Sequence, residues 1–312
     1  MVKTNSALLV LFLVGSISLN VRAQGCSDAG VCSIGSSHPI AGDSTSIDGR
    51  ATSSVSLTTS LGMGEEGVSI FQIIPEINIG ISKKISLQTR IPFMSISGNL
   101  GDVTGIGDVV TGLSFVANKK PTTKTVIYGG VKIPLSDANE KKKNLSLPMP
   151  YQVGIGTLDF VGGISHSFYN WQTTFGYQHV LDNGNKNEFT RKLWANNKDA
   201  QTYFESNGFI RGNDASFKLE YNFKRNKANI APGVLAIYRL NKDQILDTNN
   251  VHYDIEGSDG ITLNITGDAT YEIGKKTTLR FQFGFPVIVR DVRADGLTRS
   301  LVLNLGYYIN LN

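Results

Sequence analysis

Two cysteines and a histidine near the N-terminus are the residues whose chemistry is easiest to state. Cys26 and Cys32 are separated by five residues, and His38 follows them. A pair of cysteines in an oxidising compartment usually forms a disulfide, which is the pairing we expect. Two alternatives stay open: Cys26 is a lipidated first residue, or the thiolates bind copper or zinc together with His38. We otherwise expect no metal and no cofactor.

Catalytic chemistry would need a base held beside a nucleophile. The histidines are His38, His166, His179 and His252. His166 lies near a short connection and His179 near a long one, so we expect them at opposite ends of the molecule. The sequence contains no Gly-x-Ser-x-Gly elbow and no paired-histidine metal motif. We therefore expect that the protein is not an enzyme.

A third set of polar residues alternates with apolar ones along extended segments. From Ile261 to Ile273, apolar side chains at odd positions alternate with Thr, Asn, Asp and Glu at even positions, apart from Gly267. If these segments enclose a common interior, their charges either pair along the wall or filter small solutes. The candidate selectivity residues are Glu76, Arg90, Asp108, Lys132, Lys218, Glu220, Asp268, Glu272, Arg280 and Gln282, beside the neutral Gln72, Asn78, Gln88, Gln172, Gln178 and Asn264.

An apolar period of two over such lengths predicts long β-strands. Their length of about 12 residues exceeds the 5 or 6 usual in globular sheets and is enough to cross a bilayer at a tilt. The predicted strands are 50–62, 67–81, 85–97, 105–118, 123–135, 150–167, 170–181, 208–224, 228–240, 260–273, 276–289 and 297–311, with 200–214 as a potential extra hairpin arm.

The connections between these segments alternate between short and long. Short polar ones lie at 82–84, 118–122, 168–170, 225–227 and 274–276, with long ones between them. Tight turns at one rim and long loops at the other are typical of outer-membrane barrels, whose turns face the periplasm. We therefore predict an all-β fold, a transmembrane antiparallel up-and-down β-barrel of about 12 strands over 49–312. A soluble β-sandwich with a solvated polar face is the alternative.

Export supports this interpretation. Residues 1–24 have a Lys, a short apolar run and a small-residue cleavage pattern, which together predict a signal peptide. Residues 25–48 would be a cysteine-containing segment in the periplasm or a plug. We expect the mature chain in the outer membrane of a Gram-negative bacterium, with membrane lipid, the barrel assembly machinery and a small solute as partners. The oligomeric state is left open. Lysines in the short connections predict solvated turns and no nucleic-acid binding.

The run Pro75–Phe93, the motif Gly105-Ile-Gly-Asp108 and the run Gly130-Val-Lys-Ile-Pro134 resemble the bacterial outer-membrane family named for the meta-pathway of phenol degradation. The resemblance covers about 60 residues, and Leu135-Ser-Asp137 departs from the family's usual loop. It implies a barrel associated with uptake of aromatic or other hydrophobic compounds. The prolines suit strand ends near a rim, and Asp108 would point inward beside Arg90 or Lys132.

Two functions agree with these patterns. In the first, the barrel lets small solutes pass, hydrophobic or aromatic ones included. In the second, it transports nothing, and its long loops at 182–207 and 241–259 bind a partner or a surface ligand. Those loops carry Trp194, Tyr203, Phe204 and Tyr253, which either contact the ligand or pack the loops together.

Overall fold

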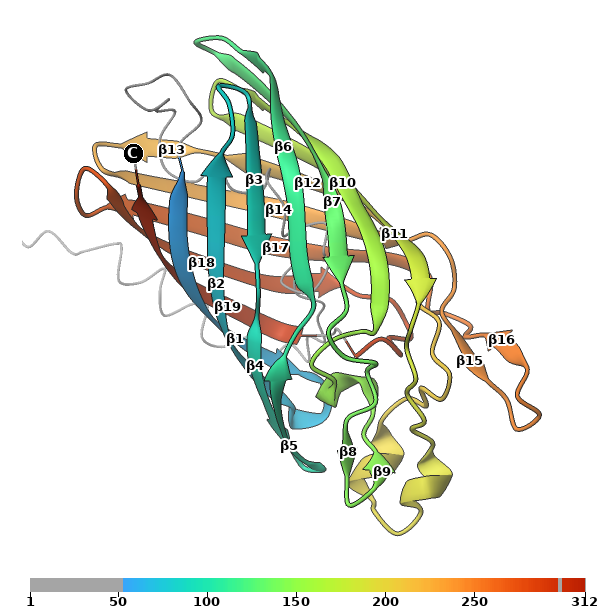
Figure 1. Cartoon of the computed structure of the whole chain (residues 1–312). Helices are drawn as coiled ribbons and strands as arrows, with labels where there is room; N and C mark the ends of the chain where they lie inside the picture. The colour runs from blue at the N-terminus through green and yellow to red at the C-terminus, as the bar shows by residue number, and fades with distance from the viewer. Residues whose placement is uncertain (1–52, 297–298, 312) are drawn as a thin grey trace, which may run out of the picture.

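The computed structural model describes residues 53–296 and 299–311. Within these ranges, long antiparallel strands form one closed β-barrel (Figure 1). The barrel closes because β1 (Ser54–Gly64) pairs with β2 (Ser69–Gly80) on one side and with the last strand, β19 (Arg299–Asn310), on the other. Closure pairs the first strand with the last, so neither is left as a free edge of the sheet, and a bilayer requires such closure of a β-structure.

The wall has twelve strands, in agreement with the prediction. Three of these strands are interrupted once, one of them near its end. Each of the three therefore carries two labels. The strands between β2 and β19 are β3 (Ile85–Arg90) with β4 (Phe93–Gly98), β5 (Gly101–Ile106) with β6 (Val109–Lys119), β7 (Thr123–Ile133), β10 (Thr157–Phe168), β11 (Trp171–Asn183), β12 (Asp214–Tyr221) with β13 (Phe223–Arg225), β14 (Ala228–Arg239), β17 (Gly260–Glu272) and β18 (Thr277–Ile288).

Apolar side chains cover the outside of the wall. On β18, Phe281 and Phe285 are 44% and 36% exposed, whereas Arg280, which directly precedes Phe281, is 7% exposed. The same alternation places Phe175 and Phe217 outside on adjacent strands. An apolar outer face around a polar inner face is the reverse of a soluble sandwich, so that alternative is wrong.

The two rims differ as the connections predict. Turns 81–84, 120–122, 169–170, 226–227 and 273–276 form the tight-turn rim. At the loop rim, the connections 134–156, 184–213 and 240–259 extend away from the wall strands (Figure 1). No helix in the described ranges is long and apolar enough to cross a membrane.

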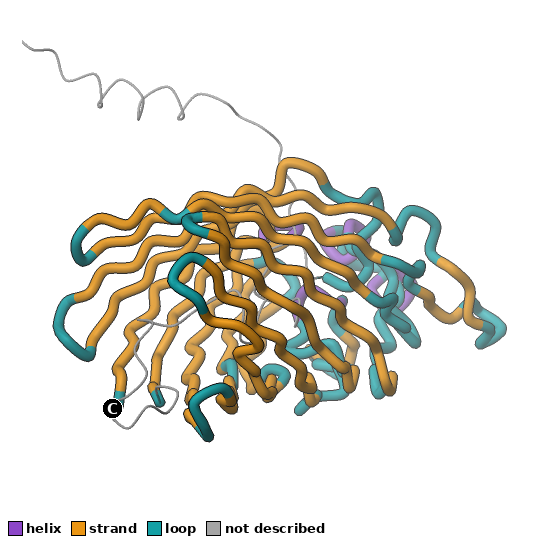
Figure 2. The backbone as a smooth tube through the Cα atoms, turned by 90° about the horizontal axis from the view of Figure 1, so that it is seen from above, coloured by secondary structure: helices purple, strands orange, loops and turns teal. Residues whose placement is uncertain are grey.

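The loops contain short elements of their own. These are η3 (Glu65–Gly67), β8 (Lys141–Lys142), β9 (Leu145–Ser146), η4 (Met149–Tyr151), η5 (Arg191–Trp194), η6 (Asp199–Thr202), β15 (Gln244–Leu246) and β16 (His252–Asp254). In the view from above, the helical turns gather at the loop end of the barrel (Figure 2).

Several predicted boundaries are wrong. Residues 150–156 and 208–213 are not in strands of the wall, and 200–214 is not a hairpin arm. Conversely, the predicted loop 98–104 is mostly strand, since β4 and β5 form a hairpin. Pro92 lies at the interruption between β3 and β4 and not at a rim, because a proline without an N–H is also tolerated where the ladder breaks.

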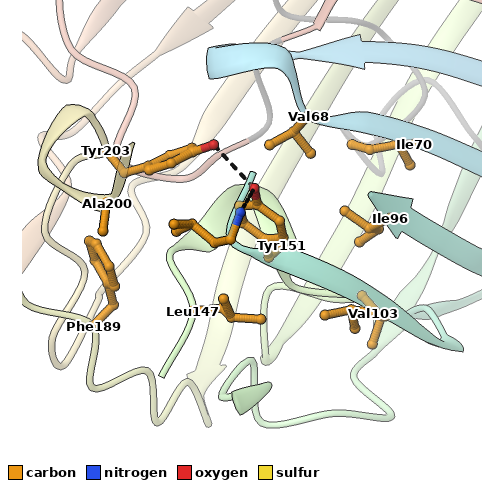
Figure 3. Packing of buried hydrophobic residues seen from close by; sticks show 11 residues of the cluster. Val68, Ile70, Ile96, Val103, Leu147, Tyr151, Phe189, Ala200 and Tyr203 are labelled. Carbon is orange, nitrogen blue, oxygen red and sulfur yellow. Dashed lines mark hydrogen bonds between the residues drawn. The ribbon is translucent and has the colours of Figure 1, made fainter. Parts of the chain in front are cut away.

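At the loop end, some loop residues pack against the inner face of the wall and form the main apolar core of the described structure. Tyr151 from η4 and Tyr203 after η6 meet inward-facing residues of β2, β4 and β5 (Figure 3). Their hydroxyl oxygens are 3.2 Å apart, and Tyr151 Oη also accepts a hydrogen bond of 3.0 Å from the Leu100 backbone N–H. This group is called the loop core: Val68, Ile70, Ile96, Leu100, Val103, Leu147, Tyr151, Val153, Phe189, Ala200 and Tyr203.

Candidate functional site in the barrel lumen

The inner face of the wall carries the charged residues that the alternation selects. Lys132 on β7 lies at the centre of one group. Its Nζ is 3.0 Å from Asp108 Oδ2 and 3.0 Å from Asp159 Oδ2, and it donates to Thr157 Oγ1 at 3.1 Å. Gln178 on β11 donates to the same Asp159 carboxylate. Of the two partners expected for Asp108, Lys132 is therefore the one in contact.

Asp108 also fixes a loop to the wall. The backbone N–H of Ile155, in the connection 134–156, donates to Asp108 Oδ2 at 3.2 Å. Gly107 before it has no room for a side chain, since a Cβ there would lie 2.8 Å from the Met94 sulfur and 2.9 Å from the Val153 carbonyl oxygen. Gly107 thus allows the Met94 side chain and the Val153 backbone to approach the wall closely beside Asp108.

A second group of charges lies on β12, β17 and β18. Arg280 forms an ion pair with Asp268, and Gln282 donates to the same carboxylate at 2.9 Å. Lys218 and Glu220 are two residues apart on β12, so both lie on the inner face. Lys218 Nζ and Glu220 Oε1 are 2.6 Å apart. All four of these charged side chains are at most 8% exposed. They pair with neighbours on the same strand or on an adjacent strand.

The remaining candidates lie on the inner face or at the tight-turn rim. Glu76 on β2 and Arg90 on β3 stand opposite each other in register. Gln72, Gln88, Gln172, Gln178 and Asn264 are buried, and Asn78 is half-buried. Glu272 is exposed, at the end of β17. Cys26, Cys32 and His38 lie outside the described residues, within which no cluster suited to a metal ion occurs.

A cavity of about 350 Å³ opens at the tight-turn rim. Its walls come from the turns themselves and from the inward residues Gln172, Glu220, Asp268 and Arg280. The cavity is therefore lined by both signs of charge and by amide groups. Such a lining accommodates water and polar solutes.

A network of arginines and aspartates at the opposite end was not anticipated from the sequence. Arg239, the last residue of β14, donates through Nε to Asp214 at 2.6 Å and through Nη2 to Asp295 at 2.8 Å. It also pairs with Asp243. Arg290 donates to Asp295 at 2.9 Å and to the Ser258 carbonyl at 2.7 Å. The network, called the Arg239 network below, consists of Arg211, Asp214, Arg239, Asp243, Arg290 and Asp295, all at most 1% exposed in their side chains.

The loop aspartates of this network have perturbed acidities. Burial raises the pKa of Asp243, against the opposing effect of the Arg239 guanidinium. Burial would likewise raise the pKa of Asp295, but the guanidiniums of Arg290 and Arg239 outweigh it and hold that pKa below its ordinary value. Asp295 is thus ionised at neutral pH and bound by two cations, Arg239 of the wall and Arg290 of its own connection, so it joins the segment 289–296 to the wall.

A signal for part of this network was present in the sequence. Asp214 lies within the predicted strand 208–224, on the same face as Lys218 and Glu220, and Arg239 lies near the loop end of the predicted strand 228–240. Their pairing, Asp214 opposite Arg239, follows from the register once the strands are paired. The loop partners Asp243 and Asp295 have no periodic pattern that would place them.

The three histidines in the described ranges, His166, His179 and His252, make separate contacts. His166 and His179 are exposed on the wall, where they contact Thr125 at 2.9 Å and Asn213 at 3.1 Å respectively. His252, on β16, contacts the Gly208 carbonyl oxygen at 3.0 Å.

The comparisons with known proteins support the architecture. No family model matches the chain, and no curated protein does. Among solved structures, the COG4313 outer membrane channel from Pseudomonas putida F1 is similar at 13% identity, with 86% of this chain and 100% of that chain covered and a TM-score of 0.58. The NanC porin follows at 7% identity, with 82% and 100% covered and a TM-score of 0.48. The CymD monoaromatic hydrocarbon channel is 11% identical, with 95% and 99% covered and a TM-score of 0.42.

The first of these likenesses shows the fold. The protein is an outer-membrane β-barrel, which agrees with the apolar outer face and the alternation of turns and loops. The resemblance to the meta-pathway family stays a resemblance, because no family model matches.

Proposed function

We propose that the barrel conducts small solutes across the outer membrane, including hydrophobic ones. The observation that carries the proposal is the contrast along the lumen. A charged cavity opens at the tight-turn rim, and an apolar loop core lies at the other end. A solute with both apolar and polar surface would contact polar groups at the tight-turn end of the lumen and apolar groups at the loop end.

The paired charges support a conducting wall over a solid plug. A barrel of about twelve strands is wider than its inward side chains readily fill. Here the inward charges are held against the wall by neighbours on the same or adjacent strands, as in the pairs Lys218–Glu220 and Arg280–Asp268. Such pairs line a passage without crossing it.

The hydrophobic part of the proposal rests on the loop core. Ile70, Ile96 and Val103 turn apolar side chains inward, where most of the wall presents polar ones. Tyr151 and Tyr203 complete this surface with their rings, 5.7 Å apart between centroids. Displacement of the loops would expose this apolar surface at the loop end of the lumen.

Planar-bilayer recording tests the proposal directly. Folded protein should give discrete conductance steps. Charge-reversing Lys132→Glu, which alters the inner wall, should change their ion selectivity. Phe160→Leu, on the outer face of the adjacent strand β10, is the matched control. It should change neither the size of the conductance steps nor their ion selectivity. A folded wild-type protein that gives no steps and no solute uptake would refute conduction.

A second candidate function is supported by the hairpin β15–β16. Tyr253 is 47% exposed and Val251 60% exposed there, while Trp194, Tyr203 and Phe204 pack among the loops. Of the four expected contact aromatics, only Tyr253 is thus placed to meet a surface ligand. Shortening the hairpin tip at 247–251 should abolish ligand binding if the barrel is a receptor, and should leave conduction intact if it is a channel.

A further inference from the structure

The tight-turn rim carries an excess of positive charge. Its exposed bases form a set called the basic collar: Lys83, Lys84, Lys119, Lys120, Lys224, Arg225, Lys227, Lys275 and Lys276. The structure describes all of these turns. The exposed acidic residue beside them is Glu272. Four of the five turns contribute bases, so the charge surrounds the rim.

This excess is specific to one end of the barrel. The loop rim exposes lysines as well, but acids lie among them, such as Glu188 beside Lys141 at 2.7 Å and Glu256 beside Lys242 at 2.6 Å. The collar therefore does not reflect a basic surface overall. Adjacent lysines such as Lys83 and Lys84 repel each other unless anions lie close by.

The collar lies next to an aromatic belt. Phe168, Trp171 and Phe223 are exposed on the outside of the wall at this rim, at 51%, 48% and 57%. Trp171 packs edge-on against Tyr221, with ring centroids 4.8 Å apart. Aromatic side chains of this kind mark the boundary between hydrocarbon and headgroups. Lys224 and Arg225 follow Phe223 directly, so their long side chains reach the headgroup layer.

We propose that the basic collar binds anionic phospholipid headgroups in the leaflet at the tight-turn rim. The ligand chemistry is a phosphodiester with a net negative charge, which Lys and Arg attract at a membrane surface. This lipid preference adds a specific partner to the barrel and does not depend on whether the lumen conducts.

Trp171 provides a local probe of the lipids beside the collar. On one side lies the turn that contains Lys120. The backbone N–H of Tyr169, two residues before Trp171, donates a hydrogen bond of 2.8 Å to the Thr122 carbonyl oxygen of that turn. On its other side Trp171 pairs with Tyr221, just before Lys224. The second tryptophan, Trp194, lies in a loop and is replaced by Phe for the measurement. Acyl-brominated lipids quench a tryptophan only when they are in contact with it.

The protein is reconstituted in equimolar phosphatidylglycerol and phosphatidylcholine, with one lipid or the other brominated. Brominated phosphatidylglycerol should quench Trp171 about twofold more than brominated phosphatidylcholine, and high salt should reduce the difference. The quadruple variant K120Q/K224Q/R225Q/K227Q should abolish it. The matched variant K83Q/K84Q/K275Q/K276Q removes as many charges several strands away and should retain it.

Heat-modifiable gel migration verifies that each variant is folded, and K224Q/K227Q replaces the quadruple variant if that one does not fold. Equal quenching by the two lipids in the wild-type background would overturn the proposal and favour a soluble acidic partner for the collar. Retention of the preference in the variant with the nearby charges removed would overturn it as well.

Discussion

Arg239 donates a hydrogen bond to Asp295 across 2.8 Å, although the two residues are 56 positions apart in the chain. The same guanidinium binds Asp214 on the neighbouring strand and Asp243 in the connection 240–259. Arg239 thus joins two loops to the end of the wall. This contact holds the loop end of the barrel in its filled arrangement.

Replacing Arg239 with Gln should loosen the loops. Removing one partner of a buried ionic network leaves uncompensated charges and costs about 3–5 kcal/mol. We expect a lower free energy of unfolding in urea and, in planar bilayers, a larger conductance. Arg280→Gln is the comparison for stability, because Arg280 is also buried and paired. Phe160→Leu on the outer face is the control for conductance and should keep the wild-type value. A conductance of Arg239→Gln equal to that of the wild type would contradict the role of Arg239.

Acid should weaken the same contacts through Asp295. The pKa of Asp295 is lower in the folded protein than the ordinary 3.8, because Arg290 and Arg239 outweigh its burial. Such a group stabilises the fold above its ordinary pKa, and this contribution is lost as the pH falls through the folded value. Stability to urea should therefore change little from pH 7 to about 5 and decline below about 4.

Asp295→Asn should reduce the decline in acid, measured as the change in the urea midpoint between pH 6 and pH 3. Asp243 is the comparison, because burial raises its pKa, so its ionisation costs stability as the pH rises above 3.8. Asp243→Asn should leave the decline in place. An identical decline in wild type and Asp295→Asn would rule out the assignment.

Gly98→Ala should displace Tyr151 from the loop core. A Cβ at Gly98 would overlap the Tyr151 hydroxyl and lie 2.9 Å from Cζ of the ring. The tyrosine must move, which breaks its contacts with Leu100 and Tyr203. We expect faster protease cleavage in the connection 134–156. Gly129→Ala on β7 is the control, since its nearest neighbour is 3.9 Å away, and it should leave cleavage unchanged.

Phe217→Arg tests the outward wall. Phe217 is 48% exposed on β12, opposite Phe175 of β11 and away from both rims. An arginine facing lipid near the bilayer midplane costs about 2–4 kcal/mol, but near an interface only about 0–1. Phe223→Arg, at the tight-turn rim, should therefore be much less harmful. Folding yield into liposomes measures both, and equal yields would argue against this placement.

The wall could be predicted because its signal is local. The alternation of apolar and polar residues along β17 and β18 indicates which residues face lipid. It can be read from residues that are adjacent in the sequence. The inward position of Asp108 and Lys132 follows from the same pattern. Pro92 and the β4–β5 hairpin were misplaced because a single break in a ladder resembles the end of a strand.

The loop end could not be predicted for the opposite reason. Tyr203 is buried against Tyr151 from another loop, and Asp295 is bound by Arg239 from the wall. No local period marks such residues, and their partners become known only when the loops are folded. Burial of loop polar groups also depends on long-range hydrogen bonds, such as the 2.8 Å bond from Asn187 to the Ala138 carbonyl.

Solute flux into liposomes tests conduction most directly. Folded protein is reconstituted, and uptake of small solutes is followed by vesicle swelling, with Arg239→Gln and the outward control Phe160→Leu beside the wild type. We predict uptake through the wild type, faster uptake through Arg239→Gln, and no acceleration through Phe160→Leu. An absence of flux in both the wild type and Arg239→Gln, with heat-modifiable migration showing folded barrels, would contradict the proposal that this barrel conducts solutes.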